Sequence, residues 1–215
     1  NMSLIKKFRI KSFKEERPII ELKNITISYG NRQIVEQFNL NLQKSVICGL
    51  LGPNGAGKSS IYHSIIGLVK PTFGKIIIDG VDATSIPTHQ RCSKFGISWV
   101  PQYGGSWSDL SVFDNLMAIA ELHIKNNEER LSKVNNLIRK FELQNVVKIK
   151  SKFLSGGQVR KLTLAMAMVK NTKILILDEP FAALDPQSVR MIQQIIVSLQ
   201  MFEKISVSVS DHSSR

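Results

Sequence analysis

The sequence contains little cysteine and no long hydrophobic run. Its two cysteines, Cys48 and Cys92, have no metal-ligand spacing and provide no disulfide framework. No apolar stretch approaches the roughly 18 residues of a membrane-spanning helix, and the longest candidate, 46–51, has the length of a strand. The N-terminal residues lead into a basic stretch and not into the apolar segment of a signal peptide. We therefore expect a soluble chain in the cytoplasm.

Acidic residues are scarce. The 215 residues include 17 Asp or Glu against 29 Lys or Arg, a net charge of +12. Residues 121–173 hold twelve basic against four acidic residues, and residues 1–17 hold six against two. A lysine-rich solvated surface and a face held against anionic lipid or an acidic partner both explain this distribution. Because no aromatic-basic interleaving or nucleic-acid motif is present, we expect no nucleic acid partner.

Strand-like and helix-like segments alternate along the chain. Short β-branched or apolar runs predict strands at 19–29, 34–42, 46–51, 75–79, 97–100, 173–177 and 205–209. Apolar residues at helical spacing predict helices at 59–69, 111–123, 131–141, 158–169 and 186–199. The apolar faces of these helices include Leu68, His123 and Leu131. This order predicts an α/β fold with a mostly parallel sheet and an inserted α-helical subdomain.

A glycine-rich segment follows the apolar run at 46–51. It has the pattern glycine, four residues, then Gly-Lys-Ser, and reads Gly52-Pro53-Asn54-Gly55-Ala56-Gly57-Lys58-Ser59. The glycines let backbone N–H groups curl around phosphate oxygens, and the following helix presents its positive N-terminus. This P-loop predicts that Lys58 reaches the β- and γ-phosphates and that the Ser59 hydroxyl binds Mg²⁺. Ser60 is included among the predicted nucleotide-binding residues.

Two carboxylates follow a second buried strand. Asp178 and Glu179 come directly after Ile174-Leu175-Ile176-Leu177, at the sheet edge where ligands bind in parallel α/β folds. Beside a P-loop, Asp178 is suited to hold Mg²⁺, directly or through water, and Glu179 to polarise an attacking water. The pair predicts hydrolysis of ATP.

The segment Leu154-Ser155-Gly156-Gly157-Gln158 opens a predicted helix. Exposed N–H groups and a serine hydroxyl at a helix N-terminus form a second anion site. With these residues the chain resembles the ABC ATPases over residues 18–212, because they form the complete signature motif of that family. The resemblance implies that ATP is bound between two copies of the chain, with the signature of one copy facing the P-loop of the other.

The resemblance also assigns domains and further site residues. It implies an N-terminal antiparallel β subdomain, a basic extension at 1–17, and one ATPase domain at 18–215 with its helical subdomain at about 103–172. It implies that Tyr29 stacks on adenine, that Gln102 contacts Mg²⁺ and water, and that His212 contacts the γ-phosphate. The implied catalytic residues are therefore Glu179, His212 and Gln102, and the implied metal ligands are Ser59, Gln102 and Asp178.

Two features of the chain depart from the family. Met166 occupies a position where arginine is common, which weakens the expectation of salt bridges near the signature motif. The sequence ends three residues after His212, where cassettes of this kind continue for a few more elements, so truncation of a longer cassette is an open alternative. Ala183-Leu184-Asp185, by contrast, is similar to the loop that crosses the dimer contact.

Four segments are similar to the ATPases of the lipopolysaccharide-export transporters of Gram-negative bacteria. They are 86–89, 100–102, 111–118 and 177–189. The runner-up is the ATPases of branched-chain amino-acid importers, which share the Pro-x-His feature but differ at Pro101 and Phe181. Soluble ABC proteins that act on nucleic acid are a third alternative, but they usually carry two cassettes or a long coiled coil. A non-hydrolysing regulatory cassette is disfavoured because Glu179 and His212 are intact.

The resemblance thus predicts an ATP-hydrolysing subunit that works with transmembrane subunits at the cytoplasmic face of the inner membrane. Tyr103, Trp107 and Phe113 lie close together where the core meets the helical subdomain. Aromatic residues are frequent at interface hot spots. We therefore expect Tyr103 and Trp107 to border a groove for a helix of the membrane subunit, and Phe113 to pack in the core.

Overall fold

The computed structural model describes residues 17–212, so nearly all of the extension expected at 1–17 lies outside the described residues. Within them, an antiparallel sheet has the strand order β2-β1-β4-β5 and a parallel sheet has the order β3-β8-β7-β6. The antiparallel sheet consists of β1 (Ile20–Tyr29), β2 (Arg32–Leu42), β4 (Phe73–Ile78) and β5 (Val81–Asp82). The parallel sheet consists of β3 (Ile47–Leu51), β6 (Ile97–Val100), β7 (Ile174–Leu177) and β8 (Ser206–Asp211).

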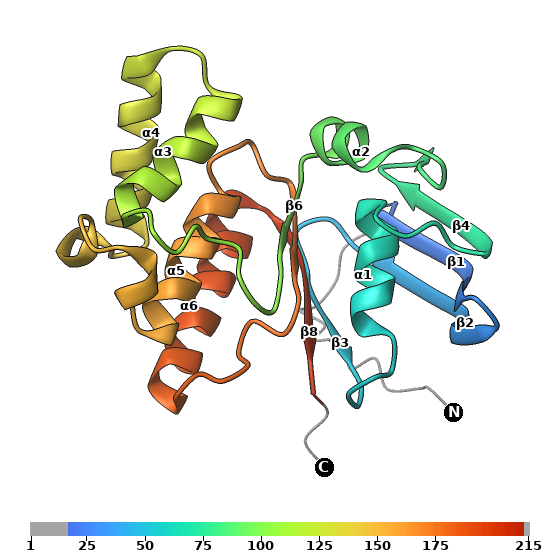
Figure 1. The fold of residues 1–215 in the computed structure, drawn as a ribbon. Coiled ribbons are helices and arrows are strands. Elements are labelled where there is room, and N and C mark those ends of the chain that lie inside the picture. The colour runs from blue at the N-terminus through green and yellow to red at the C-terminus, as the bar shows by residue number, and fades with distance from the viewer. Residues whose placement is uncertain (1–16, 213–215) are drawn as a thin grey trace.

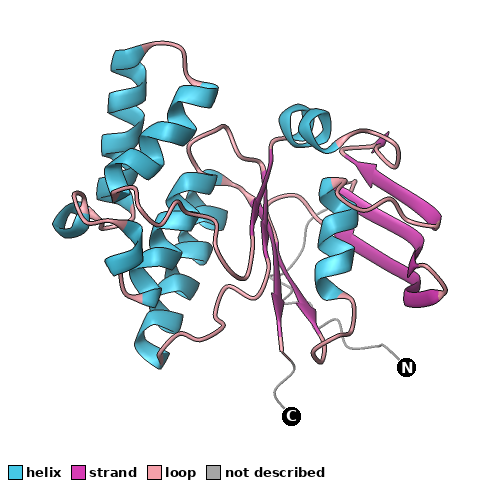
Figure 2. Cartoon of the chain, viewed as in Figure 1, coloured by secondary structure: helices cyan, strands magenta, loops and turns pink. Residues whose placement is uncertain are grey.

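Helices cover both faces of the parallel sheet. They are α1 (Lys58–Ile66), α2 (Thr88–Phe95), α3 (Val112–His123), α4 (Asn127–Lys140), α5 (Gly156–Ala167) and α6 (Pro186–Glu203). Figure 1 shows α3 to α6 on one side of the parallel sheet, with α1 and the antiparallel sheet on the other. Figure 2 shows the same division as a mainly helical half and a half that contains most of the strands. In the range 17–212, none of the helices is both long and apolar enough to span a membrane.

Strand β7 of the parallel sheet is buried on both faces, and it is apolar at four consecutive positions. In β7, Leu175 and Leu177 pack into a core that they share with α3 to α6. Ile174 and Ile176 point the other way, into a core that they share with α1 and the antiparallel sheet. Continuous apolar runs are typical of parallel strands covered on two sides. The same feature explains why the short run could be recognised as a strand in the sequence.

Strand β8 places serines inside the protein. Ser206, Ser208 and Ser210 are buried, although they alternate with valines as surface hydroxyls would. Each hydroxyl has a partner: Ser206 Oγ accepts from Ser45 N at 2.9 Å, and Ser208 Oγ pairs with the Tyr62 hydroxyl at 3.0 Å. Burial raises the pKa of the Tyr62 phenol, so this group stays neutral. Ser210 contacts the site described below.

The burial of several helical residues differs from what the sequence predicted. Leu116 and Ala120 of α3 are buried as expected, whereas His123 at the end of that helix is exposed. Leu131 is 36% exposed and Leu68, beyond the end of α1, is 56% exposed. These three placements on apolar faces were wrong because each residue lies within about four residues of a helix end or beyond it, where the packed face has ended. Helix α2 was not predicted because Arg91 and Phe95 are its only buried residues.

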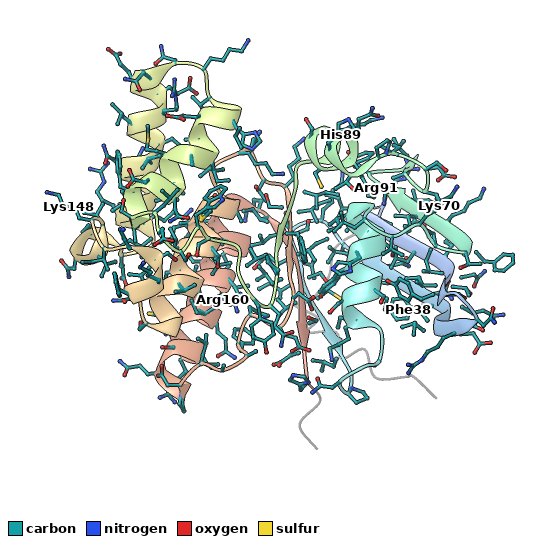
Figure 3. All side chains as sticks on the ribbon, in the orientation of Figure 1. Phe38, Lys70, His89, Arg91, Lys148 and Arg160 are labelled. Atoms are coloured by element: carbon teal, nitrogen blue, oxygen red, sulfur yellow. The ribbon has the colours of Figure 1, made fainter. Side chains whose placement is uncertain are left out.

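Arg91 of α2 is buried against the C-terminal end of α1 (Figure 3). Its Nη1 donates to the carbonyls of Ser64 and Ile65 at 2.7 and 2.9 Å. Its Nη2 donates to Thr84 O at 3.3 Å and to Ile86 O at 2.9 Å. The last carbonyls of a helix have no partner within the helix, and a cation there also interacts favourably with the helix dipole. Arg91 therefore anchors the helix whose other end follows the P-loop.

Replacing Arg91 with methionine removes its hydrogen bonds to these carbonyls, and the Ser64 carbonyl then keeps only the Gly67 N–H at 3.3 Å. Each unsatisfied buried polar group costs about 1–3 kcal/mol, so we expect Arg91→Met to lower the free energy of unfolding by about 3 kcal/mol. Thermal denaturation followed by circular dichroism measures the change. The control is Lys94→Met, which removes an exposed cation from the same helix and should shift Tm by no more than about 2 °C. Equal Tm values for the two variants would contradict the anchoring role.

Candidate functional site

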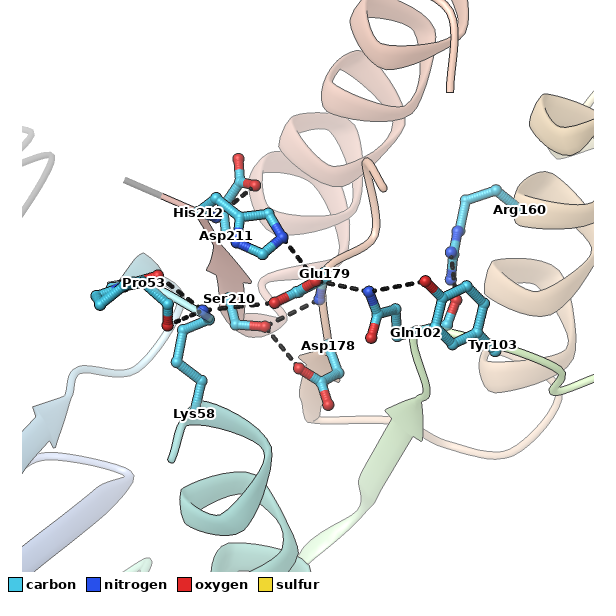
Figure 4. Close-up of polar contacts among 11 residues, drawn as sticks. Pro53, Lys58, Gln102, Tyr103, Arg160, Asp178, Glu179, Ser210, Asp211 and His212 are labelled. Carbon is cyan, nitrogen blue, oxygen red and sulfur yellow. Dashed lines mark hydrogen bonds and ion pairs between the residues drawn. The ribbon is translucent and has the colours of Figure 1, made fainter. Parts of the chain in front are cut away.

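The four parallel strands deliver their carboxyl ends to one edge of the sheet. The P-loop follows β3, Gln102 follows β6, Asp178 and Glu179 follow β7, and His212 follows β8. Segments that lie up to 160 residues apart in the chain are adjacent here because β3 pairs with β8, β8 with β7, and β7 with β6. In open parallel sheets this is the edge where ligands bind. Figure 4 shows the side chains that gather there.

The P-loop leaves the N-terminus of α1 open to an anion. Gly55 and Gly57 have φ angles of 78° and 86°, in the left-handed region that favours glycine. A Cβ on Gly57 would lie 2.7 Å from Cγ2 of Val35, so a side chain there has no room. Helix α1 has no side-chain cap and no acidic residue in its first turn. Its first N–H groups and its dipole are therefore available to a phosphate.

Lys58 is the first residue of α1 and is only 6% exposed. Its Nζ donates to the carbonyl oxygens of Gly52 at 2.7 Å and Pro53 at 3.1 Å. The same atom lies 3.4 Å from Glu179 Oε1. The ammonium is therefore held inside the P-loop and directed at the carboxylate that follows β7, which joins the two motifs in one site.

Side chains that follow the other strands of the sheet contact the carboxylate of Glu179. Gln102 Nε2 donates to Glu179 Oε2 at 2.7 Å, and His212 Nε2 lies 3.0 Å from the same oxygen. Lys58 faces the other oxygen, so three side chains from three segments hold one buried carboxylate. The backbone of Glu179 has a φ of 46°, which is uncommon for a residue other than glycine. Strained conformations of this kind are often found at functional sites.

Ser210 contacts both acidic residues, and the sequence did not indicate it. Its hydroxyl accepts from the backbone N–H of Glu179 at 2.9 Å and donates to Asp178 Oδ1 at 2.7 Å. Ser210 has no exposed surface. In the sequence it is one of several serines that alternate with valine, which is also the pattern of a half-exposed strand. Only the pairing of β7 with β8 reveals the role.

Tyr29 and Ser60 meet at the side of the P-loop. The Tyr29 ring, at the end of β1, is 48% exposed, and its hydroxyl donates to Ser60 Oγ at 3.4 Å. An exposed aromatic face beside a phosphate-binding turn can stack on a planar base. Ser59 is exposed in the first turn of α1.

The donor set of the site suits Mg²⁺. Asp178 is buried, Ser59 contributes a hydroxyl, and Gln102 contributes an amide oxygen. Mg²⁺ prefers oxygen ligands and is usually bound by one or two protein groups together with water and substrate phosphates. Residues 17–212 contain no cluster of three or more His, Cys, Asp or Glu residues placed to bind a metal. Oxygen donors of these kinds suit a metal ion whose other ligands are water and phosphate oxygens.

The signature residues form the N-terminus of α5. Ser155 Oγ accepts from Gln158 N at 3.3 Å, and Gln158 Oε1 accepts from Ser155 N at 2.9 Å, which together make a capping box. A Cβ on Gly157 would lie 2.6 Å from Ser188 Oγ, so the motif packs closely on the start of α6. In the described part of the chain, no hydrogen bond or ion pair links this motif to the P-loop. Ser155 and Gly156 are exposed.

A P-loop at the end of β3, with two carboxylates at the end of β7 in the same parallel sheet, defines a P-loop ATPase. The protein-family model described as ABC transporter matches residues 35–182. The lipopolysaccharide export system ATP-binding protein LptB of Haemophilus influenzae is 37% identical over 198 residues, which cover 92% of this chain and 81% of that protein. The chain belongs to the ABC transporter family. The predicted ATP binding and ATP hydrolysis are thereby confirmed.

Solved cassettes share the fold. The ATP-binding cassette MJ1267 of an ABC transporter aligns with a TM-score of 0.84 at 23% identity, over 93% of this chain and 83% of that chain. The ATP-binding cassette MJ0796, solved as a dimer with ADP and Pi, aligns with a TM-score of 0.78 at 26% identity, over 90% of this chain and 88% of that chain. The predicted fold class, a P-loop NTPase with an antiparallel β subdomain and an inserted helical subdomain, is confirmed.

Proposed function

We propose that this chain is the ATP-hydrolysing subunit of a transporter that exports lipopolysaccharide. The observation that carries the proposal is the convergence of Lys58, Gln102 and His212 on Glu179 beside an open P-loop. The substrate class is supported by the LptB relative, which aligns with most of both chains. Export also agrees with Pro101 and Phe181, the positions that separate this chain from the importer ATPases.

In the proposed mechanism, each residue acts by position and charge. The P-loop N–H groups and Lys58 bind the phosphates, and phosphate oxygens compete with the carbonyls of Gly52 and Pro53 for the Lys58 ammonium. Glu179 orients the attacking water and accepts its proton. Gln102 and His212 hold the Glu179 carboxylate, while Ser210 fixes the backbone behind it. Phosphoryl transfer depends mainly on positioning and electrostatic stabilisation, which this arrangement supplies.

The site would hold Mg²⁺ through Ser59, Asp178 and Gln102. When bound, the ion would neutralise charge on the β- and γ-phosphates. Ser210 keeps Asp178 in position because its hydroxyl donates to Oδ1 of that carboxylate. Tyr29 would stack on the adenine, next to the P-loop serine that its hydroxyl already contacts.

A second copy of the chain would complete the site. The signature residues present an exposed helix N-terminus that has no contact with the P-loop of the same chain in the described residues. A helix N-terminus favours an anion, and the related cassette MJ0796 is a dimer. We assign Ser155, Gly156, Gly157 and Gln158 to the γ-phosphate of ATP bound by the other copy.

The segment around Trp107 would receive the membrane subunit. Tyr103 is 75% exposed and Trp107 is 47% exposed, whereas Phe113 packs against the helical core. The backbone of Trp107 is nevertheless fixed, because Asn115 Oδ1 accepts from its N–H at 2.8 Å and Asn115 Nδ2 donates to its carbonyl at 3.1 Å. Exposed aromatic rings on a fixed backbone are suited to fill a pocket of a partner.

Purification of the tagged chain from solubilised membranes of its source tests the proposed function. We expect membrane subunits and lipopolysaccharide to co-purify with the parent chain. We expect Trp107→Ala to reduce the recovered membrane subunit by at least about tenfold, as for an interface hot spot, with ATP binding unchanged. The control is Phe202→Ala, which removes an even more exposed aromatic ring from α6. A complex that lacks lipopolysaccharide would contradict the proposed substrate. Equal losses of membrane subunit in both variants would contradict the proposed docking site at Trp107.

The basic surface of the helical half lies beside the same segment. Of its twelve basic residues, Arg160 and Lys161 are buried, so part of the charge faces the interior. The exposed lysines of the stretch 147–153 are Lys148, Lys150 and Lys152. This stretch runs along residues 107–113, as the bond from Val112 N to Ile149 O at 3.1 Å illustrates. We assign it to the membrane surface that surrounds the transporter subunits.

Pelleting with vesicles that contain phosphatidylglycerol tests this assignment. We expect the parent chain to bind at low salt and to dissociate as salt rises, because exposed charges are screened. Replacing Lys148, Lys150 and Lys152 together by glutamine should reduce binding at least about tenfold, since each surface lysine contributes about 1 kcal/mol. The control replaces Lys44, Lys70 and Lys75, exposed lysines from the opposite half. Binding that is indifferent to salt, or equally weak in both variants, would favour a merely solvated surface.

A further inference from the structure

Arg160 lies inside the protein, between the signature helix and the loop that carries Gln102. It belongs to α5, five residues after Ser155, and is 8% exposed. Its Nη1 donates to Pro101 O at 3.0 Å and its Nη2 donates to Gln102 O at 3.0 Å. Figure 3 shows Arg160 on the side of the helices that faces the parallel sheet. Burial lowers the pKa of its guanidinium below the usual value, and no ion pair involves it in the described part of the chain.

The placement of Arg160 requires a specific geometry. A guanidinium has a planar fork of N–H donors and can bind two neighbouring acceptors at once. Here the two acceptors are consecutive backbone carbonyls. Lys161, the next residue of α5, is also buried but points elsewhere, with its Nζ 2.9 Å from Glu142 Oε2. Of these two adjacent cations, only Arg160 contacts the loop after β6.

The backbone carbonyl and the side-chain amide of Gln102 contact different parts of the site. Its carbonyl is bound by Arg160, and its side-chain Nε2 donates to Glu179 Oε2 at 2.7 Å. A helix rises about 1.5 Å per residue, so Arg160 lies roughly 7.5 Å along α5 from Ser155. One continuous series of contacts therefore joins the signature motif to Glu179 through Arg160 and Gln102.

We propose that Arg160 is a positioning residue, which holds the backbone of Gln102 on α5 so that the signature helix and the Gln102 amide move together relative to Glu179. The proposal rests on the proposed function, because it deepens the role of that same site. When the signature of this chain engages ATP on the second copy, α5 shifts as a rigid helix. The two hydrogen bonds carry that shift to Gln102, and the Gln102 amide then sets the orientation of Glu179 in its own site.

A double-mutant cycle in steady-state ATP hydrolysis tests the proposal. We expect Arg160→Gln to lower kcat between about 10- and 100-fold, as misplacement of a positioned group does, with the KM for ATP changed less than about threefold. Gln102→Ala should lower kcat to a similar extent. Because Arg160 acts through Gln102, the double variant should be no slower than Gln102→Ala alone, since residues in one contact network are not additive.

Two further variants separate positioning from stability. Arg160→Lys keeps the buried charge but loses the fork, so we expect it to recover only part of kcat. Lys161→Gln removes a neighbouring buried cation from the same helix and should leave kcat within about twofold of the parent. Losses that multiply in the double variant, or an equal loss in Lys161→Gln, would overturn the role of Arg160. A parent chain without ATPase activity would instead overturn the proposed function.

Discussion

Glu179→Gln should hydrolyse ATP at least about 100-fold more slowly than the parent chain, while its affinity for ATP is retained. Glutamine has the shape of glutamate but lacks the negative charge that polarises water. The Glu179 carboxylate is buried and is held by Lys58, Gln102 and His212, so the substitution removes the charge on which these three contacts converge. Phosphate release over time measures the rate, and calorimetry measures the affinity.

The control for this variant is Glu121→Gln, which neutralises an exposed carboxylate of α3. Its rate should remain within about twofold of the parent, as expected of a surface substitution. A Glu179→Gln variant that hydrolyses ATP at the parent rate would show that another group activates the water. Loss of ATP affinity together with loss of rate would show that Glu179 acts by holding Lys58 and not as a base.

Lys58→Ala should abolish measurable ATP binding, with Kd raised at least about 100-fold. Lys58 is the only cationic side chain of the P-loop, and its buried ammonium lies at the N-terminus of α1. The substitution removes the charge that the phosphates require and also the ammonium that lies 3.4 Å from Glu179 Oε1. Isothermal titration with ATP measures the affinity, and ADP provides a second ligand that lacks the γ-phosphate.

Lys44→Ala is the matched control, because Lys44 is exposed and pairs with Asp79 on the surface at 3.0 Å. Its ATP affinity should equal that of the parent. Undiminished affinity in Lys58→Ala would mean that the phosphates bind elsewhere. A fall in affinity for ADP as large as that for ATP would indicate that Lys58 acts mainly on the β-phosphate.

The strands and most helices could be predicted because their local patterns are strong. The apolar run before Asp178 and the glycine pattern before Lys58 each define a structure without help from the rest of the chain. Helix α2 was missed because it buries little, and a short helix with a polar surface has no apolar periodicity to detect. Errors at Leu68 and Leu131 have a related cause, since periodicity does not indicate where a helix leaves the packed core.

Most residues of the candidate site could be predicted from the sequence, but the contacts between them could not. Gln102 and His212 were assigned from the family resemblance, and nothing local indicates that both contact Glu179. That contact follows from the order of the parallel strands, which is a property of the whole fold. Ser210 and Arg160 were missed for the same reason. A serine in an alternating strand and a basic residue in a basic helix are ordinary features until the fold supplies their partners.

The proposed dimer encloses ATP between two copies of this chain, with the signature of one copy on the P-loop of the other. Analytical ultracentrifugation of Glu179→Gln tests it, because slow hydrolysis preserves bound ATP. We expect a dimer with ATP and Mg²⁺, and a monomer without nucleotide. Adding Ser155→Asp keeps a residue that caps helices well but places a negative charge against the γ-phosphate, so this double variant should stay monomeric with ATP. Dimers of equal stability with and without Ser155→Asp, or no dimer in Glu179→Gln with ATP, would contradict the proposed dimer.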